Sequence, residues 1–107
     1  MILVKISRNK RGQIYGFTAR NHSGGIVCAA VSALILNTVN SIEAFTEEAL
    51  SYDIPADDTG DIELRLPDIE AGNEGWDVDL LLSSMLLGLN NIKEQYPSQI
   101  TIDDPGS

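Results

Sequence analysis

The chain has 107 residues, of which 43% are hydrophobic, a length that allows one packed core and hence a single domain over residues 1–107. Its formal net charge of −9 repels phosphate, which argues against direct binding of nucleic acid. Its single cysteine excludes an intramolecular disulfide and the four-cysteine zinc sites, and no long unbroken apolar run or signal-peptide pattern occurs; we therefore expect a soluble cytoplasmic protein with no metal, no cofactor and no membrane partner.

The N-terminal residues predict a β-hairpin. Apolar side chains occupy every second position of residues 2–7, a period typical of a strand with one buried face. A polar turn that ends at Gly12 leads into a second strand over residues 13–19. The loop over residues 21–25 then enters a helix that we expect to begin near Ile26.

This first helix is apolar on nearly all sides in its opening half, which predicts that it is largely buried. Polar residues 37–41 weaken the helical pattern, and helical spacing resumes from Ile42 to Leu50. One long helix, or two helices with a break near residues 37–40, both fit this pattern.

The C-terminal half predicts a strand, a helix and a last strand. Residues 61–66 alternate between apolar and polar, and Pro67 ends the strand. A turn-rich connection over 68–75 precedes an amphipathic helix over 77–96, and residues 99–102 form a short strand. The order β-β-α-β-α-β predicts an α+β fold with a mostly antiparallel sheet packed against two helices.

Charge is distributed unevenly along the chain. The first 42 residues contain five basic residues and no acidic one, whereas all 16 acidic residues lie from Glu43 onward, with only Arg65 and Lys93 to offset them. An acidic surface favours a cationic partner, because complementary charge speeds encounter. The alternative, that acidity only keeps the protein soluble, stays open at this point.

His22 and Cys28 are the only histidine and the only cysteine, and five residues separate them. A thiol attacks as a thiolate, and a helix N-terminus and a nearby imidazole both favour that form. The pair at a helix start therefore suggests a cysteine-dependent hydrolase. The alternative is that Cys28 is a buried core residue, which is common for cysteine.

The segment from Ile26 to Ser32, Ile-Val-Cys-Ala-Ala-Val-Ser, preceded by His22, resembles the signature of the Prp family of ribosomal-processing cysteine proteases. Further similarity occurs at the opening strand, at residues 38–42, and at 88–89 and 95–97. The resemblance implies that Cys28 is the nucleophile, His22 its partner base and Ser32 a supporting residue. It also implies a bacterial, cytoplasmic homodimer that cuts the N-terminal extension from a basic large-subunit ribosomal protein.

The sequence departs from the family pattern next to the proposed site. Asn21 replaces a glycine, Gly25 replaces an aspartate, and the loop between His22 and Cys28 is shorter than usual. Either the loop is short or the chain lacks residues there, and we favour the second explanation. We expect residues 23–25, Ser23, Gly24 and Gly25, to form a flexible loop.

The N–H groups of residues 27–29 are the expected oxyanion donors. The third member of a catalytic triad cannot be assigned from the sequence. Two alternatives to the protease remain: a non-catalytic acidic adaptor with Cys28 buried, and a thiol redox role, which the lack of a second cysteine makes weaker.

Overall fold

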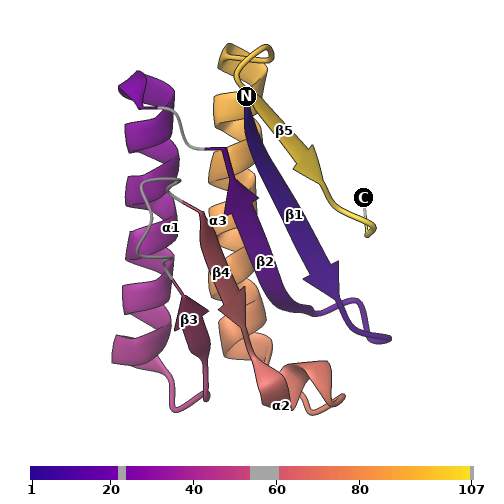
Figure 1. Ribbon diagram of the computed structural model, residues 1–107. Helices are drawn as coiled ribbons and strands as arrows, with labels where there is room; N and C mark the ends of the chain where they lie inside the picture. Colours follow the sequence, from indigo (N-terminus) through magenta and orange to yellow (C-terminus); the bar gives the residue numbers. More distant parts are fainter. Residues whose placement is uncertain (22–23, 54–60, 107) are drawn as a thin grey trace.

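A five-stranded sheet forms one layer of the computed structural model, which describes residues 1–21, 24–53 and 61–106 (Figure 1). The strands, in the order β3-β4-β2-β1-β5 across the sheet, are β1 (Ile2–Arg8), β2 (Ile14–Arg20), β3 (Ser51–Asp53), β4 (Ile62–Arg65) and β5 (Ile100–Asp103). Strand β5 pairs with β1 in parallel, and the other three pairings are antiparallel. The mostly antiparallel sheet predicted from the sequence is confirmed.

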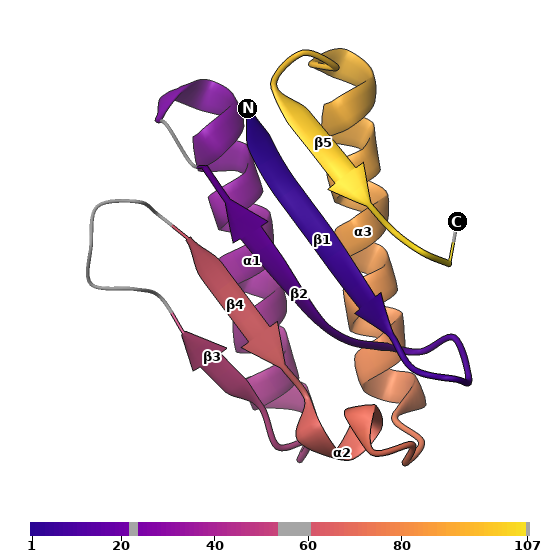
Figure 2. The same cartoon turned by 45° about the vertical axis from the view of Figure 1, so that its right-hand side comes forward.

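Two long helices cover one face of this sheet, and no described helix covers the other face (Figure 2). They are α1 (Gly25–Phe45) and α3 (Trp76–Gln95), while the short α2 (Pro67–Glu70) lies between β4 and α3 in the chain. Helices α1 and α3 pack side by side: a Cβ built on Gly88 of α3 would lie 2.6 Å from Leu34 Cδ2 of α1. The α+β architecture with two covering helices therefore agrees with the prediction.

The core lies between the sheet and the helices. Strand β1 buries its alternate residues, as the period of two predicted, and each long helix buries one stripe. The main contributors are Ile2, Val4 and Ile6 from β1, Val27, Val31 and Ile35 from α1, and Val78, Leu82, Met85 and Leu89 from α3. This layer of side chains packs α1 against the sheet, on the side of β2 and β4 (Figure 2), and so determines where Cys28 lies.

Several details differ from the prediction. Helix α1 is one unbroken helix, and it ends at Phe45 instead of continuing to Leu50. The cause is Thr46, which adopts an extended backbone and directs both its N–H (3.1 Å) and its hydroxyl (2.8 Å) to the carbonyl oxygen of Ile42. The residues after it then form β3, and part of the expected connection after Pro67 forms α2; neither element was predicted.

Helix α1 is, by length and composition alone, apolar enough to cross a membrane. This property was not predicted from the sequence, because polar residues such as Asn37 interrupt the apolar run. A core helix of a globular domain passes the same composition test, and six residues of α1 are buried against the rest of the fold. Its apolar character is therefore accounted for partly by the core and partly by an exposed face.

Candidate active site

The site predicted from the sequence lies where β2 ends and α1 begins (Figure 1). Strand β2 ends at Arg20 and α1 starts at Gly25, so only four residues join the two elements. Asn21, Gly24 and Gly25 have positive φ angles of 64°, 86° and 89°. A Cβ on either glycine would meet no atom within 4 Å, so the left-handed backbone, and not crowding, is what favours glycine there.

Among the described residues, no side chain caps the start of α1. Gly24 is the N-cap and provides no side-chain hydrogen bond, and the first turn contains no acidic residue. The first four N–H groups of a helix have no intrahelical acceptor. In α1 these are the N–H groups of residues 24–27. The expected oxyanion donors at residues 27–29 overlap this set at Val27, and their role stays a prediction. These N–H groups and the helix dipole make this end favourable for negative charge.

Cys28 lies in the first turn of α1. Cα–Cβ bonds of a helix tilt toward its N-terminus, so the thiol is directed toward the start of α1. The side chain is partly buried and packs against the edge of the core. Cys28 is therefore neither a fully buried core residue, as the adaptor hypothesis required, nor fully exposed. Ser32, also partly buried, follows one helical turn later on the same face.

His22 and Ser23 lie outside the described residues, so the expected His22–Cys28 pair and the flexibility of the loop at Ser23 stay predictions. The chain itself is continuous from residue 1 to 107, and five residues separate His22 from Cys28. The expectation that residues are missing from this loop is therefore wrong: the short loop belongs to the protein.

The described residue before His22 is tied to a distant part of the chain. The N–H of Asn21 donates to Oδ1 of Asp61 at 3.2 Å, across a sequence separation of 40 residues. Asp61 directly precedes β4, which pairs antiparallel with β2 through Ala19 and Ile62. Asp61 was not predicted as a site residue, because its position before a strand with one exposed face does not indicate which strand it pairs with.

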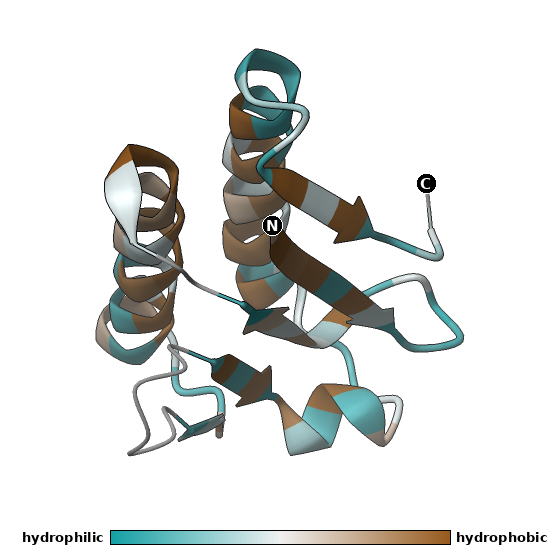
Figure 3. Ribbon diagram, turned by 45° about the horizontal axis from the view of Figure 1, so that its top comes forward, coloured by the Kyte–Doolittle hydropathy of each residue, from teal (hydrophilic) through white to brown (hydrophobic). Residues whose placement is uncertain are grey.

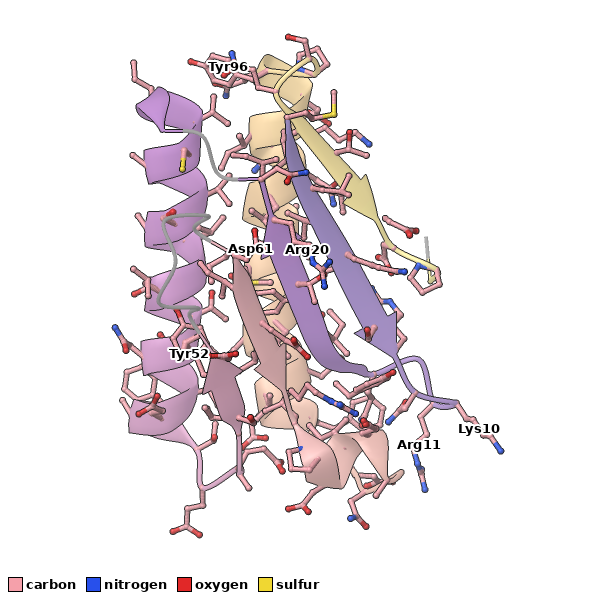
Figure 4. All side chains as sticks on the ribbon, viewed as in Figure 1. Lys10, Arg11, Arg20, Tyr52, Asp61 and Tyr96 are labelled. Carbon is pink, nitrogen blue, oxygen red and sulfur yellow. The ribbon has the colours of Figure 1, made fainter. Side chains whose placement is uncertain are left out.

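A shallow hollow on the open sheet face lies beside this junction. Arg20 and Asp61, which are labelled in Figure 4, line it together with residues of β2, β3 and β4. Its lining side chains are Thr18, Arg20, Asp53, Asp61, Ile62 and Glu63. Three carboxylates and one guanidinium thus surround a space next to the predicted catalytic loop. Within the ranges that the structure describes, no group of three or more His, Cys, Asp or Glu residues is placed to hold a metal ion.

Comparison with known proteins gives consistent results. The family model described as Cysteine protease Prp matches residues 1–101. The ribosomal processing cysteine protease Prp of Staphylococcus aureus strain Mu50 is 30% identical over 109 residues, covering 96% of this chain and 98% of that protein.

Solved structures agree with this family match. The crystal structure of an S. aureus ribosomal processing protease Prp with a covalently linked product peptide has a TM-score of 0.84 and 30% identity, covering 96% of this chain and 98% of that one. A second S. aureus structure holds a substrate peptide, with a TM-score of 0.84, 28% identity and the same coverage. A Streptococcus mutans structure has a TM-score of 0.82 and 31% identity, covering 96% of this chain and 92% of the other.

Proposed function

This chain belongs to the cysteine protease Prp family, and on that premise we propose that it is an endopeptidase in which Cys28 is the nucleophile and His22 the base. Residues 1–107 act as a single protease domain. The observation that carries the assignment is the position of Cys28, partly exposed in the first turn of a helix that no described side chain caps. That position combines access for a substrate with N–H groups that favour negative charge.

The proposed reaction uses the groups at this helix start in two steps. His22 accepts the thiol proton as Sγ of Cys28 attacks the peptide carbonyl carbon, and the negative oxygen that forms is stabilised by the N–H groups of residues 25–27. His22 then donates the proton to the leaving amine, and water hydrolyses the thioester. Ser32 lies one helical turn from Cys28 on the same face of α1 and has a supporting role beside the nucleophile.

The proposed substrate is the N-terminal extension of a basic large-subunit ribosomal protein. The relatives from S. aureus are ribosomal processing proteases, one captured with a substrate peptide and one with a product peptide. The excess of acidic residues from Glu43 onward suits a basic substrate. We place the reaction in the bacterial cytoplasm, with no direct contact to nucleic acid or membrane.

The assignment is tested with a peptide that spans the junction of the extension, followed by mass spectrometry. Wild-type protein should cut the peptide once, and Cys28→Ala should not, because the alanine removes only the attacking sulfur. Circular dichroism confirms that the variant is folded. Cleavage by Cys28→Ala at the wild-type rate would exclude Cys28 as the nucleophile.

A second copy of the chain is the partner that we propose for the outer faces of α1 and α3. Residues 25–42 of α1 and 80–92 of α3 contain no charged side chain, although the chain has a net charge of −9. Large apolar residues are exposed on these helices, and Figure 3 shows the hydrophobic colouring that runs along both of them: Ile26 (81%), Leu36 (40%), Trp76 (60%), Leu80 (71%) and Leu87 (65%). Because like-charged copies repel elsewhere, an uncharged layer is where a homodimer would form.

The dimer is tested by light scattering after size exclusion. Leu80→Lys should lower the measured mass from that of a dimer to that of a monomer, since a charge would be buried between copies. Leu3→Lys is the matched control, because Leu3 is 44% exposed on the opposite face of the molecule. A wild-type protein that is monomeric at tens of micromolar would rule out this proposal.

A further inference from the structure

We propose that Asp61 is a positioning residue for His22, acting through the backbone N–H of Asn21. This inference rests on the proposed function, which assigns the role of base to His22. It also supplies the orienting group that the sequence did not identify.

The first observation is how the β2–β4 ladder ends. The last paired residues are Ala19 and Ile62, after which β2 runs on to Arg20 and the chain turns at Asn21. At that point the N–H of Asn21 donates to Oδ1 of the Asp61 carboxylate at 3.2 Å. A hydrogen bond to a charged acceptor is stronger than a neutral one, so it fixes the backbone beyond the end of the sheet.

The second observation is the conformation of Asn21. Its φ of 64° is the only positive value at a non-glycine position in the described part of the chain. Asparagine tolerates the left-handed region better than other non-glycine residues, but the conformation still needs support from its surroundings. The bond to Asp61 provides that support at an exposed residue that has little packing of its own.

The third observation is the shortness of the connection. Only His22 and Ser23 lie between Asn21 and Gly24, where the helix N-cap begins. His22 follows Asn21 directly in the sequence, and a trans peptide unit separates consecutive Cα atoms by only about 3.8 Å. A shift of Asn21 is therefore passed directly to the base, and misplacement by about 1 Å can lower a rate about 100-fold.

The test compares three variants in the junction-peptide assay. Asp61→Ala removes the acceptor and should lower kcat about 10- to 100-fold with KM changed less than about twofold, because the substrate contacts remain. Asp61→Asn should retain most of the wild-type kcat, since its amide oxygen can still accept the Asn21 N–H. Asp53→Ala is the matched control: Asp53 lines the same hollow and loses the same charge, but Asn21 donates to Asp61. It should leave kcat unchanged.

A measurement on the unmutated protein tests the bond itself. Asn21 is exposed, so without this bond its amide would exchange with solvent at the rate of an unstructured peptide. Slow exchange supports the proposal, even if Asp61→Ala proves unable to fold. Exchange at the unprotected rate overturns it.

The kinetic outcomes separate the two proposals. A wild-type protein that does not cut the peptide defeats the proposed function, whereas an active wild type with an equally active Asp61→Ala defeats only the positioning role. An Asp61→Asn variant as slow as Asp61→Ala also overturns the inference, since the effect would then follow the charge and not the acceptor.

Discussion

A methyl group added at Gly16 should destabilise the pairing of β2 with β4. Gly16 lies in β2 opposite Arg65 of β4, and a Cβ built there would be 2.5 Å from the carbonyl oxygen of Leu64. It would also be 3.5 Å from Arg65 Cα. These are backbone atoms, so Gly16→Ala cannot be accommodated by turning a side chain and must move β2 away from β4.

The size of the effect follows from two opposing terms. Overpacking costs about 1–3 kcal/mol, and the upper end applies because the clash is with backbone. Replacing glycine also lowers the entropy of the unfolded chain, which stabilises the folded state by about 0.4–1 kcal/mol. The free energy of unfolding should therefore fall by about 2 kcal/mol. With a urea m-value of about 1.5 kcal/mol/M, the midpoint falls by about 1.3 M.

The measurement is urea denaturation followed by circular dichroism. Gly88→Ala is the matched control, because its new methyl meets the flexible end of Leu34 at 2.6 Å and alanine is favoured in a helix by about 1 kcal/mol. Its midpoint should change much less than that of Gly16→Ala. A Gly16→Ala midpoint within about 0.3 M of wild type would refute the argument from backbone contact.

Two further predictions concern acidic residues, and each is measured as the free energy of unfolding against pH. The hydrogen bonds from Arg8 (2.7 and 2.9 Å) lower the pKa of Asp104, so the pair stabilises the fold above the ordinary pKa of 3.8 and the stability is lost as pH falls below it. Asp104→Asn should therefore cost about 1–3 kcal/mol at pH 7, and an equal loss at pH 3 would contradict this. Burial, and then the charge of Asp68, raise the pKa of Glu48, so its ionisation opposes folding as pH rises through that pKa. Glu48→Gln should be more stable than wild type at pH 7 and no more stable below pH 4.5; a uniform gain at all pH values would contradict the cause.

The periodicity of apolar residues predicted the helices and strands that bury one face along their length. The alternation of Ile2, Val4 and Ile6 identified β1, and the 3.6-residue spacing identified α3 to within a residue at each end. The end of α1 was not predicted, because helical spacing continues past Phe45 while the hydrogen bonds of Thr46 end the helix. The three-residue β3 is too short to show a period.

The sequence by itself determined the family, the α+β class and the place of Cys28 at a helix start, because these depend on residues close together in the chain. Only the tertiary structure decided which strands are neighbours: β4 pairs with β2, and β5 joins β1 in parallel. Periodicity reports which face of an element is buried, but not its partner, since pairing depends on contacts between residues far apart in sequence. The bond from Asn21 to Asp61, across 40 residues, exists because of that pairing.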